Sequence, residues 1–215
     1  MGDKNKRSHL WSFIVIGVVL TAYAFGVALN AMNAREADVI YKKDEGVALE
    51  CVVTWEASGL DELMDKAAEM EAPVTFFMTA DFAENHQALV ASMLAKGFDI
   101  GLLCADMDGL SRDAATLISL GADVSHVMPA SNVDSSALEK AASKIGMTTV
   151  LCTFELKNTV TDPAELIKKV GDSSFDGAII RFQPAKTTVK AFSGIIETLR
   201  QMGLTLSNLD DGNQE

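Results

Sequence analysis

The sequence predicts an α/β fold, a distorted (β/α) barrel of about seven strands, preceded by one transmembrane helix. Short apolar runs alternate with amphipathic segments from Val47 to Leu209, a pattern typical of a largely parallel sheet with helical crossovers. The first strand is not followed by the G-x-G-x-x-G turn of nucleotide-binding doubly wound sheets, so a barrel is favoured. A long uncharged segment near the amino terminus predicts the membrane helix.

Length and charge limit the possible classes of protein. A chain of 215 residues that is 48 % hydrophobic can bury one full core, so a single folded domain is expected. The net charge of −12 argues against nucleic acid and anionic lipid head groups as partners of the folded part. The acidity is unevenly spread, because the first 35 residues contain four basic side chains and only one aspartate.

Residues 10–32 form the predicted membrane anchor. The segment is apolar and long enough for a helix of roughly 20 residues, the length that spans a bilayer. The basic flank Lys4-Asn-Lys6-Arg7 precedes it. This predicts a single-pass protein of the cell membrane, with a cytoplasmic stub over residues 1–9 and an extracytoplasmic body. The alternative is a cleaved signal peptide, whose apolar core is normally about 7–15 residues, shorter than this one.

The rest of the chain divides into a charged linker over 33–46, the barrel over 47–210 and a tail over 211–215. Within the barrel, the periodicity of apolar residues and the capping residues predict helices. One of them has Ser111 as its N-cap, and another starts at Thr161-Asp-Pro163. The expected strands are 47–53, 73–78, 98–103, 124–128, 148–152, 178–182 and 204–209. The helix capped by Ser111 is expected over 111–120, and the remaining expected helices are 60–70, 80–96, 135–145 and 187–202.

Several of these segments carry a resemblance. The strand that ends in Thr54-Trp-Glu-Ala-Ser58 resembles the first motif of the polysaccharide deacetylases (the NodB-homology domain, carbohydrate esterase family 4), which reads Thr-Phe-Asp-Asp-Gly. Ala72-Pro-Val-Thr-Phe-Phe-Met-Thr79 is similar to that family's second strand, and Gly97-Phe-Asp-Ile-Gly101 to its Gly-His-Glu-Ile-Gly strand. Gly177-Ala-Ile-Ile180 and the helix over 195–203 resemble its last strand and helix. The resemblance covers residues 47–209 and implies the family's barrel.

For catalysis the resemblance implies a loss. The family holds a divalent metal through an aspartate and a His-x-x-x-His pair, and these three positions fall on Ala57, Leu103 and Met107. Alkyl and thioether groups cannot replace carboxylate and imidazole as ligands of such an ion. Only the adjacent base position, Glu56, keeps a carboxylate. The resemblance therefore implies a degenerate deacetylase with no metal or other cofactor.

Further positions of the family's groove are also changed. The arginine-proline motif that orients the base falls near Met128 without its arginine, and the late histidine falls on Gln183. Trp55 lies at the head of the groove and has two interpretations. It stacks on a sugar ring, or it forms a lid over the emptied metal pocket, packed on Met107 and Met128.

The other candidate residues give weaker patterns. Asp99, Asp106, Asp108 and Glu155 stand near strand ends and offer, with Glu56, an oxygen-rich site for calcium or magnesium, although solvated loops are favoured. Of the three histidines, His9 precedes the body, His86 is expected on a helix surface, and His126 in the core or at an edge. Cys51, Cys104 and Cys152 are expected as small core residues, and a Cys51–Cys152 disulfide requires their Cα atoms within about 7 Å.

Two functions of different classes follow. The first is a membrane-anchored, catalytically inactive deacetylase-like protein that touches peptidoglycan, another glycan or an envelope protein, and the lipid bilayer through residues 10–32. The second is an active carbohydrate N-deacetylase with an atypical site around Glu56, Asp106 and Glu155. Amide hydrolysis needs an activated water and an acid for the leaving amine, which the second function must draw from carboxylates alone.

Overall fold

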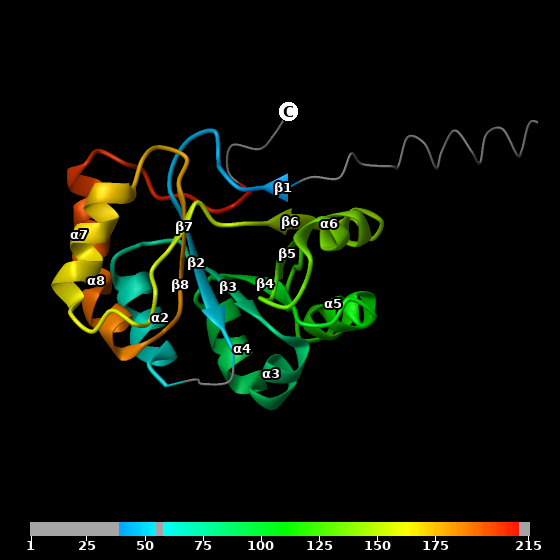
Figure 1. The fold of residues 1–215 in the computed structure, drawn as a ribbon. Coiled ribbons are helices and arrows are strands. Elements are labelled where there is room, and N and C mark those ends of the chain that lie inside the picture. The colour runs from blue at the N-terminus through cyan, green and yellow to red at the C-terminus, as the bar shows by residue number, and fades with distance from the viewer. Residues whose placement is uncertain (1–38, 55–57, 211–215) are drawn as a thin grey trace, which may run out of the picture. The chain divides into compact units, whose positions relative to one another are not determined.

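A computed structural model describes residues 39–54 and 58–210 and is an α/β fold around one parallel sheet (Figure 1). Its eight strands follow the order β1-β6-β5-β4-β3-β2-β8-β7, and every pairing is parallel. The strands are β1 Val39–Ile40, β2 Ala48–Val53, β3 Thr75–Met78, β4 Asp99–Cys104, β5 His126–Pro129, β6 Thr148–Val150, β7 Phe154–Glu155 and β8 Ile179–Phe182. The helices are α2 Leu60–Glu69, α3 Ala80–Asn85, α4 Gln87–Ala95, α5 Leu110–Ser119, α6 Ser135–Ser143, α7 Pro163–Ser173 and α8 Lys186–Gln201.

One bent segment connects the two edges of the sheet. β6 pairs with β5 and β1, while β7, which begins four residues after β6 ends, pairs with β8. Between them, the Leu151 N–H donates to Ile40 O (2.8 Å) and the Thr153 N–H donates to Ile179 O (2.9 Å). The sheet therefore curves back on itself, which confirms the predicted distorted barrel.

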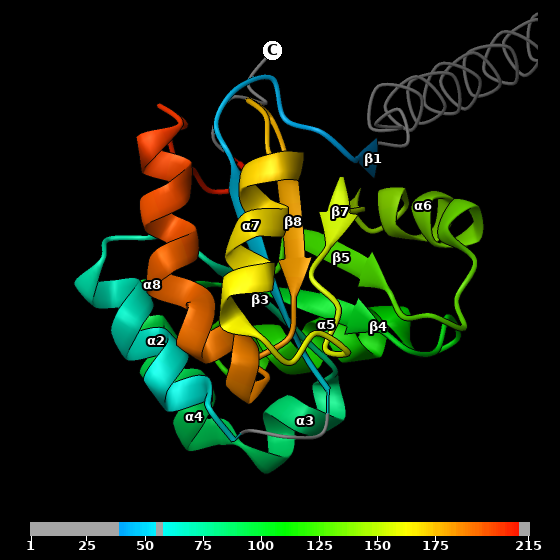
Figure 2. The ribbon, with the colours of Figure 1, turned by 60° about the vertical axis from the view of Figure 1, so that its left-hand side comes forward.

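The barrel wall has a different hydrophobic cluster on each face. Side chains alternate along a strand, so Leu49 and Cys51 of β2 point outward into the larger cluster beneath the helices, whereas Ala48 and Val52 point inward. The helices surround the sheet, with α7 and α8 side by side outside β8 (Figures 1 and 2). The inner cluster consists of Ile40, Ala48, Val52, Phe77, Leu103, Met128, Val150, Ile179 and Leu209.

The segment after α8 closes the end of the barrel at which the strands begin. We predicted a strand over 204–209, but the structure has a single bridge there, between Val47 and Leu206, so this prediction was wrong. The chain then turns away from β2, and Leu209 enters the inner cluster with 1 % of its surface exposed. The buried Lys43 ammonium donates to Ser207 Oγ (2.7 Å) and to the Asn208 carbonyl oxygen. These hydrogen-bond acceptors compensate the cost of burying the charged Lys43 side chain.

Two helix predictions differ from the structure. The single helix expected over 80–96 is divided at His86, whose backbone leaves the helical region (φ −130°, ψ 41°). Its imidazole Nδ1 lies 2.8 Å from Phe82 O, the carbonyl that a continuous helix would pair with the His86 N–H, and its ring stacks on Phe82. Helix α5 begins at Leu110, and Gly109 precedes it without a side-chain cap, so Ser111 is not the N-cap.

The other element predictions agree within a few residues, and α7 has Pro163 in its first turn after the Asp162 cap, as expected. The predicted linker contains β1, which joins the sheet at β6. Throughout 39–54 and 58–210, no helix combines the length and the apolar character needed to cross a bilayer. The predicted anchor over residues 10–32, the stub over 1–9 and the tail over 211–215 lie outside the described residues.

Gly101 of β4 provides a test of packing inside the barrel. A Cβ added there would lie 2.3 Å from the Phe77 ring, so Gly101→Ala is expected to lower the free energy of unfolding by about 1–3 kcal/mol. The matched control is Gly171→Ala in α7, where the new Cβ would meet Thr198 at an ordinary 3.5 Å. That substitution is expected to raise stability by about 0.5–1 kcal/mol, because alanine is the better helix former. Urea denaturation of both variants measures the difference, and equal effects would contradict the packing argument.

Candidate functional site

The barrel mouth lies at the carboxyl ends of the parallel strands, where the loops of a β/α fold converge. The loops after β4, β5, β7 and β8 belong to this end. Trp55, Glu56 and Ala57, which follow β2, lie outside the described residues. The described side chains of the mouth are those that follow the other strands.

Two of the predicted groove positions fill the barrel interior with apolar groups. Leu103 of β4 is 6 % exposed and Met128 of β5 is 1 % exposed, and the two residues are paired in register. Both belong to the inner cluster, together with Phe77 and Val52. Met107, four residues after Leu103, packs instead against the cluster beneath the helices. The two positions that match the family's histidine pair thus contact different clusters.

Gln183 follows β8 and is half-buried. Its Oε1 accepts a hydrogen bond from Asn158 Nδ2 at 2.5 Å, and its carbonyl accepts from the Ala185 N–H. Asn158 lies in the loop between β7 and α7. The amide of Gln183 therefore ties two loops of the mouth together.

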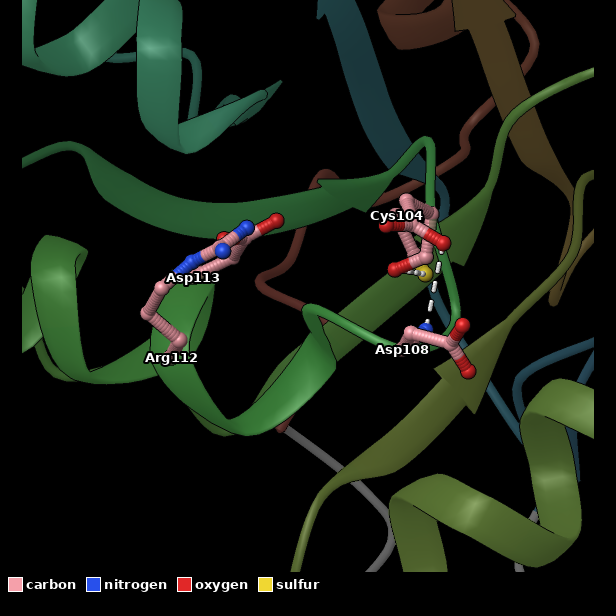
Figure 3. A network of polar contacts seen from close by, with 5 residues as sticks. Cys104, Asp108, Arg112 and Asp113 are labelled. Carbon is pink, nitrogen blue, oxygen red and sulfur yellow. Dashed lines mark hydrogen bonds and ion pairs between the residues drawn. The ribbon is translucent and has the colours of Figure 1, made fainter.

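The loop between β4 and α5 carries the acidic residues of the mouth (Figure 3). Asp106 Oδ1 accepts from the Asp108 N–H (3.2 Å), and the Cys104 thiol contacts the Asp106 carbonyl (3.5 Å). Arg112 pairs with its neighbour Asp113 at 3.0 Å in the first turn of α5, apart from Asp108 in the view. Asp106 thus forms a local turn contact, and the Arg112 guanidinium is already paired with Asp113.

The carboxylates that sequence spacing suggested as an oxygen-rich site do not all share one end of the barrel. Asp99 is the first residue of β4 and lies at the opposite end from Asp106 and Asp108, which follow β4. Glu155 is exposed at the end of β7. Within the described part of the chain, no group of three or more His, Cys, Asp or Glu side chains is arranged to hold a metal ion.

His126 is a core histidine, as predicted. It is buried in β5, with Ser125 Oγ 3.0 Å from its Nδ1 and Asp210 Oδ1 3.3 Å from its Nε2. Burial lowers its pKa, and the nearby Asp210 and Asp123 only partly oppose this effect. This side chain fastens the carboxyl-terminal segment to the closed end of the barrel, far along the strand from the mouth.

The three cysteines are free thiols. Cys51 and Cys104 are buried in the cluster beneath the helices, as predicted for small core residues, and burial raises the pKa of each thiol. Cys152 is half-buried against the inner cluster. A Cys51–Cys152 disulfide is absent from the structure.

An ion pair that the sequence analysis did not identify lies inside the barrel. Arg181 Nε of β8 is 3.3 Å from Glu50 Oε2 of β2, and the two residues are in register on adjacent strands. The Glu50 side chain is fully buried, and burial raises the pKa of its carboxyl to about 7 even though Arg181 opposes the shift. Desolvation thus exceeds the attraction of a single guanidinium contact.

The sequence does contain a signal for this pair. Glu50 and Arg181 are single charges of opposite sign within strands that are otherwise apolar, Ala48–Val53 and Ile179–Phe182. Charged residues are rarely buried without a partner. Once β2 and β8 are known to be neighbours, each of these two residues is therefore the expected partner of the other.

A surface pocket of about 350 Å³ lies at the other end of the barrel, away from the mouth. Its lining joins the turn before β2 to the residues after α8, and the Gly46 N–H donates to Asp176 Oδ1 (2.6 Å) there. The lining residues are Glu45, Gly46, Asp176, Gly203, Leu204, Thr205 and Ser207.

No protein-family model matches the sequence, and no curated protein shows a significant match. Solved structures do match the fold. A family 4 carbohydrate esterase (CE4) pseudoenzyme from Bacillus anthracis has a TM-score of 0.73 at 17 % identity, over 84 % of this chain and 70 % of that chain. A mutant of that pseudoenzyme with restored enzymatic activity matches equally well, at 0.73 and 16 % identity, over 84 % of this chain and 73 % of that chain.

Two further structures have the same fold. The family 4 carbohydrate esterase PdaA of Bacillus subtilis has a TM-score of 0.73 at 18 % identity, over 86 % of this chain and 88 % of that chain. The peptidoglycan N-acetylglucosamine deacetylase Bc1960 has a TM-score of 0.71 at 16 % identity, over 81 % and 92 %. These likenesses confirm the fold that the sequence motifs implied, a deacetylase-like barrel.

The raised pKa of Glu50 makes stability depend on pH in a defined direction. The folded state binds a proton between pH 4.5 and about 7 that the unfolded state releases. This contribution is complete below pH 4.5 and is lost as the pH rises through about 7, a change of about 3 kcal/mol for such a shift. The loss of stability between pH 5 and pH 8, measured as the fall in the urea midpoint, should therefore be smaller in Glu50→Gln than in the unsubstituted protein.

The matched control for this measurement is Glu155→Gln, which removes an exposed carboxylate at the end of β7. His126 contributes a dependence of the opposite sign, because its lowered pKa favours the folded state as the pH rises. The Glu50 effect is therefore taken as the difference between variant and parent. An unchanged difference between pH 5 and pH 8 in Glu50→Gln would contradict the assignment.

Proposed function

We propose that this protein is a membrane-anchored, catalytically inactive deacetylase-like protein of the cell envelope, which binds glycan or a protein partner at the barrel mouth. The observation that carries the proposal is the chemistry of the mouth. Leu103 and Met128 are buried in the inner cluster, and Met107 packs on the outer one. None of these side chains offers an oxygen or imidazole donor to a hard or borderline divalent ion.

The fold likeness points to glycans as the class of ligand. The structures of the same fold include a peptidoglycan N-acetylglucosamine deacetylase and a CE4 pseudoenzyme. A barrel that has exchanged metal ligands for apolar side chains keeps its outer loops, in which Gln183 and Asn158 are already joined. Loops tied together above buried apolar side chains suit the binding of a ligand more than hydrolysis, which needs donors for a metal ion.

The anchor is part of the proposal because of the sequence over residues 10–32. Its apolar length and basic flank are typical of a signal anchor. A single-pass anchor would hold the barrel in the outer compartment next to the cell wall, where glycan is concentrated. Protease accessibility of the barrel in intact cells, with the amino-terminal stub protected, tests this orientation.

The second candidate is an active N-deacetylase that uses Glu56 as its base. The carboxylates of Asp106, Asp108 and Glu155 at the mouth favour it, since they follow strands that converge there. The two functions make opposite predictions about metal and product.

Purified full-length protein is expected to contain no stoichiometric zinc and to release no acetate from N-acetylglucosamine oligomers, because the positions of the ligand set hold alkyl and thioether groups. The measurements are metal analysis and acetate release. The variant that combines Ala57→Asp, Leu103→His and Met107→His is expected to gain zinc, since it restores the three donor types. Stoichiometric zinc in the parent, with deacetylation abolished by Glu56→Gln, would establish the active enzyme instead.

Glycan binding is expected to depend on Trp55. Trp55→Ala should weaken binding of peptidoglycan fragments about five- to tenfold, because the contact of an aromatic ring with a sugar contributes roughly 1–1.5 kcal/mol. The matched control is Tyr41→Ala, which removes the exposed aromatic ring of the residue that follows β1. Calorimetry with soluble fragments measures both. Equal binding by parent and Trp55→Ala would remove the groove as the glycan site and favour a protein partner.

A further inference from the structure

The Glu50–Arg181 pair has two polar atoms left over. Only Arg181 Nε and Glu50 Oε2 contact each other, and both Glu50 Oε1 and Arg181 Nη2 are buried with no hydrogen-bond partner in the structure. Buried polar atoms are nearly always paired, and a charged group left unpaired costs several times a neutral hydrogen bond. Two such atoms beside each other indicate that something else completes the pair.

Solvent reaches this pair from one side. The Glu50 side chain has no exposed surface, whereas 17 % of the Arg181 side chain is exposed. Arg181 is the third residue of β8, close to its carboxyl end, and Gln183 of the mouth follows two residues later. The exposed part of the Arg181 side chain is therefore the side from which a small solute can reach the pair, because the Glu50 side chain has no exposed surface.

The two groups differ in how they can change charge. A guanidinium remains protonated at any ordinary pH and presents donors in a planar fork that fits a carboxylate. The Glu50 carboxyl can lose its charge by taking up a proton, since burial disfavours the charged form. When Glu50 is neutral, Arg181 keeps its positive charge, loses the ionised carboxylate beside its Nε, and still has Nη2 without a hydrogen-bond partner.

We propose that Glu50 and Arg181 form a proton-gated binding site for a small carboxylate, in which the anion takes the place of the Glu50 charge beside the Arg181 guanidinium. The proposal is independent of the glycan function. The carboxylate is that of a free organic acid or of a sugar acid, and both present the same group to the fork.

Other charged groups near the pair leave this assignment in place. The half-buried Cys152 thiol, in the segment between β6 and β7, interacts electrostatically with both Glu50 and Arg181. Burial raises the pKa of that thiol, so Cys152 stays neutral. From β3, the residue in register with Glu50 is Thr75, which does not titrate. From β7, the residue in register with Arg181 is Glu155, which also acts on Cys152 and whose side chain is exposed at the edge of the sheet.

The coupling predicts how affinity depends on pH. Binding of the anion takes up one proton at Glu50, so the affinity for acetate should be constant below pH 7 and fall about tenfold per pH unit above it. Acetate is ionised throughout pH 6–9, and its neutral isostere acetamide should bind at least tenfold more weakly at pH 6. Chemical-shift titration of the full-length protein measures these affinities.

Three variants test the assignment of each group. Glu50→Gln mimics the protonated acid and is expected to bind acetate at pH 9 nearly as well as at pH 6. Arg181→Met is expected to abolish binding at both pH values, and Arg181→Lys to retain weakened binding. Arg112→Gln, which removes an exposed arginine paired with Asp113, is the control and should leave the affinity unchanged.

The source of the carboxylate is tested separately, with glucuronate against glucose. Tighter binding of glucuronate than of acetate assigns the site to sugar acids, and binding of acetate alone assigns it to free acids. The proposal is overturned if the folded protein does not bind acetate at pH 6, if acetamide binds equally well, or if the affinity does not change between pH 6 and pH 9. If Arg181→Met does not fold, Arg181→Lys and the pH dependence of the parent decide the question.

Discussion

Closure of the barrel depends on the bent segment from Thr148 to Glu155. Its first half pairs with β5 and β1 and its second half with β8, so one stretch of backbone satisfies hydrogen-bonding groups at both edges of the sheet. Without that bend, β5 and β8 would each present an open edge, which a folded protein must cover. The inner cluster, the Glu50–Arg181 pair and the order of loops around the mouth all require the curvature that this segment imposes.

Inside the closed barrel, a layer of apolar side chains lies above a buried ion pair. The upper interior holds Leu103, Met128 and Phe77, which pack without polar atoms. Glu50 and Arg181 interrupt that packing with a pair that is only partly satisfied. Replacing clustered charge by well-packed apolar groups often stabilises a protein, whereas a half-satisfied polar pair costs stability. The contrast suggests that the pair is retained for a reason other than stability.

The fold was largely predictable from the sequence because each strand and helix has its own local period. Most strands match within two or three residues, and Pro163 marks its helix correctly. The segment over 204–209 was mistaken for a strand, because its alternating apolar residues reflect burial beneath the barrel rather than pairing along it. The break at His86 arises from one imidazole that contacts its own helix, which no periodicity reports.

The site was less predictable. The resemblance assigned Leu103 and Met128 to one groove, and they are neighbours in register. It could not show that Met107 turns to the other cluster, or that Asp99 stands at the far end of its strand from Asp106. The Glu50–Arg181 pair connects residues 131 positions apart, and such a contact becomes visible only after the order of the strands is known.

The fastening of the closed end by the last described residues has a consequence for how the chain acquires its shape. Lys43 contacts Ser207 across 164 positions, and β2 gains its β8 neighbour only when residues 179–182 are available. A nascent chain leaving the ribosome therefore carries β2 with one bare flank until nearly all of the protein has been synthesised. Pairing between strands far apart in the sequence slows folding. It also prolongs the exposure of unpaired backbone N–H and C=O groups, which are prone to aggregation. A helper that shields the emerging barrel would thus act on β2 rather than on β8.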